Sequence, residues 1–213
     1  LRYFLVSLVF FPVFAGKILC IFANCRRNLI VILPLMLVIS FNSIWWNALI
    51  LKKTTFEETR EWLAKNVSPQ TPIATMGIRA LGYAPSKDAA NVIRRTNPGY
   101  YRMASTLIGE SYPENVRNII YTGQFKRGSE SANLEAALEV YPVRYVVNTY
   151  LNINQRLINE KSSVRLKLVA HFSPTGEVIY DEDIPGILID AGNAVPLTKV
   201  NRAGPYIDVL EIN

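Results

Sequence analysis

The first 56 residues of this 213-residue sequence contain no acidic side chain, because all 17 Asp and Glu residues lie at Glu57 or beyond. Only four basic residues precede Lys52: Arg2, Lys17, Arg26 and Arg27. Of the 23 basic residues, 19 therefore accompany the 17 acidic ones in the rest of the chain. Most of the net charge of +6 therefore comes from the basic residues of the apolar first quarter, and the rest of the chain is nearly neutral. This distribution does not favour a basic face that binds nucleic acid.

Cysteine and histidine are scarce, with two residues and one residue. Cys20 and Cys25 would point in different directions on a helix, and neither belongs to a Cys/His cluster of the zinc-site kind. His171 lies between Ala170 and Phe172 in an apolar stretch, without a second His or Cys as a partner. We interpret His171 as a structural residue.

Several sequence motifs that carry chemistry are absent. The sequence has no Gly-rich phosphate loop, no Gly-x-Ser-x-Gly and no His-Glu-x-x-His, which disfavours soluble nucleotide chemistry. The acidic run Asp181-Glu182-Asp183 lacks the spacing of a calcium loop, and we interpret it as a solvated turn. We therefore predict no catalytic, cofactor-binding or metal-binding residue in this chain.

The longest uncharged run covers the 23 residues from Leu29 to Leu51. As a helix it would extend about 35 Å, enough to cross a hydrocarbon core of about 30 Å. The earlier apolar run, residues 1–24, contains three interruptions: Pro12, Gly16 and Lys17. It is either a truncated span or a span followed by an interfacial turn. We expect two transmembrane helices, about 1–24 and 29–51, and a soluble domain over 52–213.

Six side chains flank these runs in a manner typical of a membrane interface: Arg26, Arg27, Lys52, Lys53, Trp45 and Trp46. The two arginines form a tight connector and the two lysines follow the second run, so the distribution of positive charge is nearly balanced. It slightly favours a cytoplasmic connector and an extracytoplasmic soluble domain. The tryptophans suit interface anchors, and packing against another helix explains them equally well.

Beyond Lys52, helical and strand patterns alternate. We expect helices over 54–66 and 131–140, the first with a capping box between Thr55 and Glu58. A polar helical piece is expected over 154–161. Strands are expected over 73–76, 116–122, 144–151, 166–172 and 206–212, and near Val178 and Ile187.

In the last of these strands, apolar residues bracket the acidic Asp208 and Glu211. Apart from 116–122, the segment 79–127 shows no order of elements. The interleaving of the other helices and strands predicts an α/β fold, with a mixed sheet and flanking helices behind the membrane helices.

The densest group of arginines and tyrosines lies between residues 94 and 102. Arg94, Arg95, Tyr100 and Tyr101 are candidates for contact with lipid phosphates or a sugar at the membrane surface. A plainly exposed loop is the favoured alternative.

Six short segments follow the uncharged run in a distinctive order: 59–69, 71–75, 81–83, 143–147, 168–174 and 204–209. Together they resemble the C-terminal part of the polytopic GT-C glycosyltransferases that use lipid-linked sugars, the protein mannosyltransferase and aminoarabinose transferase group. The likeness covers roughly residues 30–213. It implies transfer of sugar from a polyprenyl-phosphate donor to an acceptor at the extracytoplasmic face, and it allows a divalent metal in the parent enzyme.

The catalytic acidic residues of that family lie in an early loop between the first membrane helices, which this sequence does not contain, so the resemblance assigns no catalytic residue here. The sequence begins at Leu1 within an apolar run and without an initiator Met, and therefore reads as part of a longer protein. We expect the C-terminal fragment of an integral membrane glycosyltransferase, whose soluble domain covers the active site and contributes to acceptor selection. Its expected partners are the lipid bilayer, other transmembrane helices or subunits, and a polyprenyl-phosphate sugar.

Two alternatives remain open. The first is a non-catalytic, membrane-anchored accessory subunit of a larger membrane protein complex. The second is a membrane-tethered solute-binding module, which requires a well-formed ligand pocket.

Overall fold

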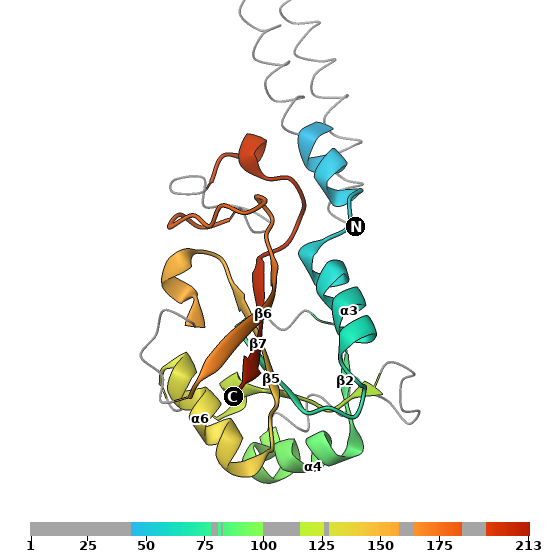
Figure 1. The fold of residues 1–213 in the computed structure, drawn as a ribbon, viewed down its shortest axis with the longest axis vertical. Helices are drawn as coiled ribbons and strands as arrows, with labels where there is room; N and C mark the ends of the chain where they lie inside the picture. Colours follow the sequence, from blue (N-terminus) through green and yellow to red (C-terminus); the bar gives the residue numbers. More distant parts are fainter. Residues whose placement is uncertain are drawn as a thin grey trace, which may run out of the picture. The chain divides into compact units, whose positions relative to one another are not determined.

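The computed structural model describes residues 44–77, 81, 83–99, 116–125, 128–157, 164–184 and 195–213. The chain divides into two compact units, Leu1–Ala48 and Leu49–Asn213. The second unit is an α/β domain with a five-stranded mixed sheet, as the sequence predicts (Figure 1). Across the described ranges we find no helix with the length and apolar character needed to cross a bilayer. The run 1–24 and most of the run 29–51 fall outside those ranges, so both spans stay predictions.

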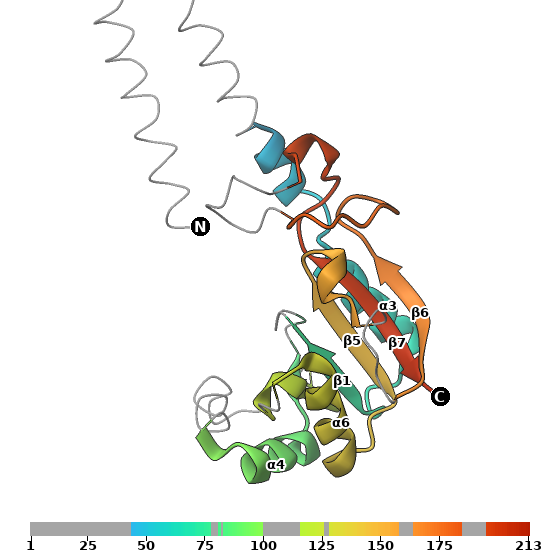
Figure 2. The same ribbon diagram turned by 90° about the vertical axis from the view of Figure 1, so that its left-hand side faces the viewer.

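The five strands of the main sheet are β4 (Ile119–Tyr121), β1 (Ile73–Met76), β5 (Tyr145–Tyr150), β7 (Tyr206–Ile212) and β6 (Leu166–Phe172), in this spatial order. Strand β1 pairs in parallel with β4 and with β5, whereas β7 pairs antiparallel with β5 and β6 (Figure 2). The carboxyl ends of β1, β4, β5 and β6 and the start of β7 therefore share one edge of the sheet. We call it the carboxyl edge.

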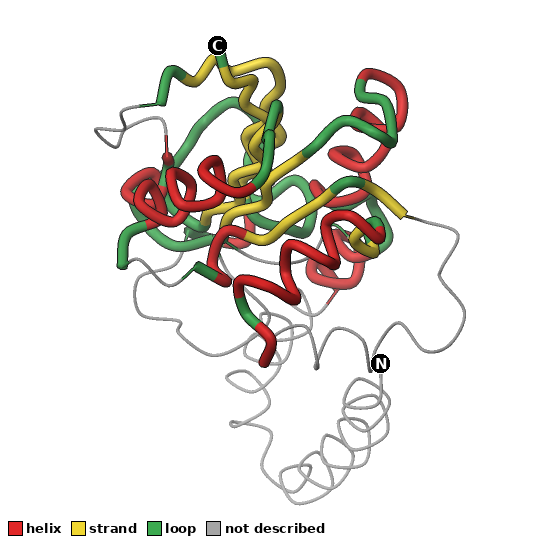
Figure 3. Tube along the Cα trace, turned by 90° about the horizontal axis from the view of Figure 1, so that it is seen from below, coloured by secondary structure: helices red, strands yellow, loops and turns green. Residues whose placement is uncertain are grey.

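The remaining elements are helices α3 (Thr55–Asn66), α4 (Lys87–Thr96) and α6 (Glu130–Val140), the 3-10 turns η1 (Thr122–Gln124), η2 (Ile153–Gln155) and η4 (Leu197–Lys199), and the short parallel pair β2 (Ala84–Pro85) and β3 (Val116–Arg117). Figure 3 shows helices on either side of the strands. Each face of the sheet is thus covered, which is typical of an α/β domain.

Helix α3 begins at a capping box that lies one residue earlier than predicted. The Thr54 side chain accepts a hydrogen bond from the Glu57 backbone N–H, and the Glu57 carboxylate accepts from the Thr54 N–H. The sequence Thr-Thr-Phe-Glu-Glu fits either register. Tertiary contact selects between them, because Thr55 is fully buried and its N–H donates to the Ala203 carbonyl at 3.1 Å.

The other end of α3 is closed by a buried arginine. The Arg117 guanidinium, in a residue only 5% exposed, donates to the carbonyl oxygens of Leu63 and Val67 at 3.1 Å each. The same guanidinium lies 5.0 Å from the centre of the Tyr83 ring. The Leu63 carbonyl also accepts from the Val67 N–H at 3.0 Å, so Arg117 supplies a second donor to Leu63 and a donor to the Val67 carbonyl just beyond the helix.

Most predicted elements are confirmed. The strands over 73–76, 166–172 and 206–212 match β1, β6 and β7 from end to end. The strand over 144–151 and both long helices agree to within one residue at each end.

The other predicted elements differ or lie outside the described residues. The strand over 116–122 is divided into β3 and β4, because the Asn118 N–H donates to the Pro69 carbonyl. The strand near Val178 is wrong: a turn precedes this residue, and the Thr175 hydroxyl donates to its carbonyl. Of the helical piece over 154–161, the structure describes only η2 and the residues directly after it. The strand near Ile187 lies outside the described residues.

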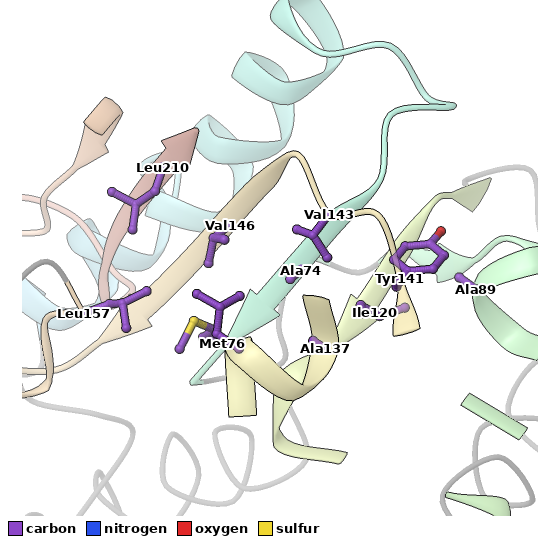
Figure 4. Packing of buried hydrophobic residues seen from close by; sticks show 11 residues of the cluster. Ala74, Met76, Ala89, Ile120, Ala137, Tyr141, Val143, Val146, Leu157 and Leu210 are labelled. Carbon is purple, nitrogen blue, oxygen red and sulfur yellow. The ribbon is translucent and has the colours of Figure 1, made fainter. Parts of the chain in front are cut away.

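The two faces of the sheet have separate hydrophobic cores. On one face α3 packs over a cluster that includes Leu63, Ile73, Val147, Ile207 and Val209. On the opposite face, which we call the α6 face, the cluster of buried residues shown in Figure 4 includes Ala74, Met76, Leu134, Val146 and Leu210. The alternation of side chains along β5 and β7 explains this division, because successive residues point to opposite faces.

Candidate functional site

A row of polar side chains crosses the α6 face near the carboxyl edge. Asn148 of β5 pairs with Asp208 of β7, and Asp208 pairs with His171 of β6. Residues that pair directly project from the same face of a sheet, so the three side chains lie side by side. The next pair along β5 and β7 is apolar, Val146 with Leu210. The polar row therefore begins where the hydrophobic core of this face ends.

Asp208 is the centre of this row. It is completely buried, and its two carboxylate oxygens accept hydrogen bonds from three side chains. His171 Nδ1 and Arg156 Nε each lie 2.6 Å from a carboxylate oxygen, and the Tyr150 hydroxyl lies at 3.3 Å. We call these four residues the Asp208 cluster. A buried carboxylate needs such partners, because leaving it unpaired costs several kcal/mol.

The protonation states in the cluster follow from these contacts. Burial opposes ionisation of Asp208, but the hydrogen bonds from His171 and Arg156, with the positive charge of Arg156, hold the pKa of Asp208 below its usual range. An ionised carboxylate only accepts, so Nδ1 of His171 carries a proton and donates to it. Burial, and then the charge of Asp208, raise the pKa of Tyr150 and keep its hydroxyl protonated as a donor.

Stacked aromatic rings position the cluster. The rings of Tyr150 and Tyr206 stack with their centres 5.4 Å apart, and His171 lies 6.4 Å from Tyr206 in a nearly parallel plane. The Tyr206 hydroxyl also interacts with the Thr175 hydroxyl at 3.1 Å and accepts from the Tyr180 N–H at 3.2 Å. The start of β7 is therefore tied to the chain that follows β6, which orders the carboxyl edge around Asp208.

Two atoms of the polar row lack a hydrogen-bond partner among the described residues: His171 Nε2 and Asn148 Nδ2. Both are almost completely enclosed. A histidine oriented by a carboxylate through Nδ1 has the arrangement of a general base that acts through Nε2. Because Nε2 is enclosed here, the geometry favours a structural role, in which the cluster holds the carboxyl edge together. This role agrees with the interpretation of His171 from the sequence.

The predicted surface contacts are described only in part. Arg94 and Arg95 are exposed in the last turn of α4, so they belong to a helix and not to a loop. Tyr100 and Tyr101 lie outside the described residues. Whether the four residues share a site therefore stays a prediction.

The predicted membrane-interface residues are described in part. Trp45 and Trp46 are helical and partly exposed, whereas Arg26 and Arg27 lie outside the described residues. Lys52 donates to the Asn201 carbonyl at 3.1 Å, and Lys53 forms an ion pair with Glu61 at 2.7 Å. Within the described ranges no three His, Cys, Asp or Glu side chains gather as metal ligands. The predicted solvated turn over 181–183 is exposed.

The burial of Asp208 is not predicted from the sequence, and neither is its proximity to Arg156, Tyr150 and Asn148. One feature of the sequence could have indicated the burial of Asp208. By alternation Tyr206, Asp208 and Leu210 share one face of the last strand, so the carboxylate follows the face that carries large hydrophobic residues.

Comparison with known proteins found no match for this chain among protein-family models, curated proteins or solved structures. The comparisons therefore assign neither a family nor an activity. Function has to be inferred from the sequence pattern and from the geometry of the described residues.

Proposed function

We propose that this chain is the C-terminal part of an integral membrane glycosyltransferase that uses a polyprenyl-phosphate-linked sugar. In this proposal residues 1–24 and 29–51 are transmembrane helices. The soluble domain lies on the extracytoplasmic side, covers the active site and contributes to acceptor selection. The catalytic residues, and any divalent metal, belong to parts of the protein that this sequence does not include.

The observation that carries the proposal is the place of the six GT-C-like segments in the fold. Five of the six, all except 81–83, supply most of α3 and parts of the adjacent strands β1, β5, β7 and β6. Helix α4 and the β2–β3 pair, which lack the resemblance, lie outside this set. Strand β4 and helix α6 also lack the resemblance and belong to the same domain, so the likeness concerns α3 and four strands of the sheet, as the proposal requires.

Exposed apolar side chains next to Lys52 provide further support. Ile50 is 50% exposed and Leu51 is 88% exposed, directly before the first two lysines of the soluble domain. Large apolar side chains beside lysines are typical of the end of a membrane span, where lysine reaches the headgroups. The proposal assigns Lys52, Lys53, Trp45 and Trp46 to this interface.

Two measurements test the proposal. The full chain, expressed in cells with alkaline phosphatase fused after Asn213, should resist extraction with alkaline carbonate and should show phosphatase activity on the extracytoplasmic side. Membranes from the source organism should transfer radiolabelled sugar from a polyprenyl-phosphate donor, and deletion of the gene should abolish this transfer. A chain that carbonate releases would refute the membrane anchor. Unchanged transfer after deletion, tested across donor sugars, would refute the enzymatic role.

The accessory-subunit hypothesis differs in one respect that can be measured. The absence of a catalytic motif from this sequence favours it. It predicts that the chain purifies in a stable complex with other membrane proteins, and that its deletion leaves sugar transfer intact while the complex loses its integrity.

A further inference from the structure

The route of the chain brings the carboxyl edge close to the proposed membrane end. Helix α3 begins at this edge, because its first residue, Thr55, is hydrogen-bonded to Ala203 just before β7. A residue extends at most about 3.6 Å, so Thr55 lies within about 14 Å of Leu51. If the run ending at Leu51 spans the membrane, the carboxyl edge lies next to the lipid headgroups. This inference rests on the proposed function.

A second segment, residues 195–204, is fixed beside the start of α3. We call it the pre-β7 loop. Lys52 donates to the Asn201 carbonyl, and Arg202 forms an ion pair with Glu58 of α3. Gly204 has φ +119°, and a Cβ at this position would lie 2.1 Å from the Thr55 hydroxyl oxygen. The pre-β7 loop therefore packs directly on α3 and cannot move far from Lys52.

The surface that these segments share has the composition of a lipid-headgroup contact. Ile50 and Leu51 expose apolar area, and Pro196, Thr198 and Lys199 are exposed on the pre-β7 loop. The ion pairs found among the described residues include no acidic partner for Lys52 or Lys199.

The other basic residues at this edge are already paired. Lys53 is bound to Glu61 and Arg202 to Glu58, so their charges are compensated within the domain. The ammonium group of Lys199 lies 5.6 Å from the centre of the Tyr180 ring, which holds it at the surface of the carboxyl edge. The exposed acidic run Asp181–Asp183 follows Tyr180 beside the pre-β7 loop, whose Val195 N–H donates to the Asp183 carbonyl, so this edge as a whole is not basic. Lys52 and Lys199 form no ion pair among the described residues and lie next to exposed apolar side chains, so they are the cationic groups of this surface that suit contact with lipid phosphates.

We infer that the pre-β7 loop is a second membrane contact of this protein, and that Lys52 and Lys199 bind phosphate headgroups of the bilayer. The carboxyl edge of the sheet then faces the membrane, with the Asp208 cluster directly behind it. The amino edge, where α6 ends at Val140, faces away from the bilayer. The partner is the lipid surface itself, and a second protein at this edge is the competing outcome.

Depth-dependent quenching tests this orientation in the full chain reconstituted into lipid nanodiscs. Cys20 and Cys25 are first replaced by serine, and a single environment-sensitive fluorophore is attached through Thr198→Cys or, as a control, through Glu139→Cys. Glu139 is exposed near the amino edge. Lipids with a nitroxide on the headgroup should quench the label at position 198 several-fold more strongly than the label at position 139.

Charge variants test the role of the lysines. Near an anionic membrane surface each lysine contributes about a fivefold change in the ratio of docked to undocked states. Lys52→Gln and Lys199→Gln should therefore reduce quenching at position 198 in nanodiscs with anionic lipid, most clearly at low salt. Lys167→Gln is the matched control, because Lys167 is exposed on β6 at the amino edge.

The outcomes separate the two proposals. Equal quenching at positions 198 and 139, in a chain that still resists carbonate, overturns the inferred orientation and leaves the membrane anchor intact. Release of the chain by carbonate overturns both. Protection of position 198 by a co-purified protein, with no quenching by lipid, also overturns the lipid contact.

Discussion

Replacement of Asp208 by asparagine is the sharpest test of the role assigned to the Asp208 cluster. Asparagine keeps the shape of the side chain and removes its charge. The variant retains one oxygen that can accept from His171 or Arg156, but it also introduces an NH2 group where only donors approach. We expect Asp208→Asn to fold with a large loss of stability.

The magnitude follows from the burial of the pair. Breaking a buried ion pair by removing one partner costs about 3 to 5 kcal/mol. The Arg156 side chain is 18% exposed and can recover part of its hydration, so we expect the lower end, about 3 kcal/mol. For a domain of this size, such a change corresponds to a fall in Tm of about 6 to 12 °C.

The assay is thermal or denaturant unfolding of the full chain in detergent, monitored by circular dichroism. Glu211→Gln is the control on the same strand, because its ion pair with Arg144 spans 3.3 Å and the Arg144 side chain is 64% exposed. That variant should lose less than about 1 kcal/mol. If Asp208→Asn is no less stable than Glu211→Gln at neutral pH, the cluster does not hold the carboxyl edge together.

The dependence on pH has a definite sign. The pKa of Asp208 is lowered in the folded state, so its ionisation contributes stability that is fully present above the unfolded pKa of about 3.9. This contribution is lost as the pH falls through the folded pKa. The difference in stability between wild type and Asp208→Asn should therefore shrink as the pH falls below about 4.

Three further substitutions and one control, Gly128→Ala, test the described contacts by the same unfolding measurement. Gly77→Ala should lower the free energy of unfolding by about 3 kcal/mol, because Gly77 has φ +74° and a Cβ would lie 2.0 Å from a carbonyl oxygen of β5. Gly128→Ala is the control. Gly128 has φ +105° but open space around a Cβ, so this variant should lose only about 1 kcal/mol. Equal losses would contradict the close approach. Thr54→Ala should cost about 1 kcal/mol through loss of the N-cap, and a neutral result would place the cap elsewhere. Arg117→Met should cost about 2 kcal/mol by removing the hydrogen bonds that the carbonyls of Leu63 and Val67 receive from the guanidinium, and a stable variant would show that these bonds are dispensable.

The strands were predicted well where local sequence decides their limits. β1, β6 and β7 are short runs rich in apolar residues, with proline or glycine at or near one end of each: Pro72 and Gly77, Pro174, and Pro205. Helix α4 was missed because its ten residues stand among proline, asparagine and glycine. Its cap at Ser86 and its buried residue Ile93 are visible only once the helix is known.

The candidate site could not be predicted from local sequence, because its members are distant along the chain. Asp208 is separated by 37 residues from His171, by 52 from Arg156 and by 58 from Tyr150. Sheet pairing brings Tyr150 and His171 beside the start of β7, and the turn η2 after β5 brings Arg156 to the same place. The alternation of side chains along the last strand could place Asp208 on an apolar face. It could not identify the hydrogen-bond donors that offset the free-energy cost of burying a carboxylate.

The position of β7 has a consequence for synthesis on the ribosome. This strand follows every other strand in the sequence, yet it lies between β5 and β6, which do not pair with each other. Until β7 has left the exit tunnel, β6 has no strand to pair with among the described elements, and Asp208 cannot compensate Arg156. The sheet can therefore close only after the chain up to Ile212 is free of the ribosome, and a chain that ends a few codons earlier would have an open, aggregation-prone gap at the centre of the sheet.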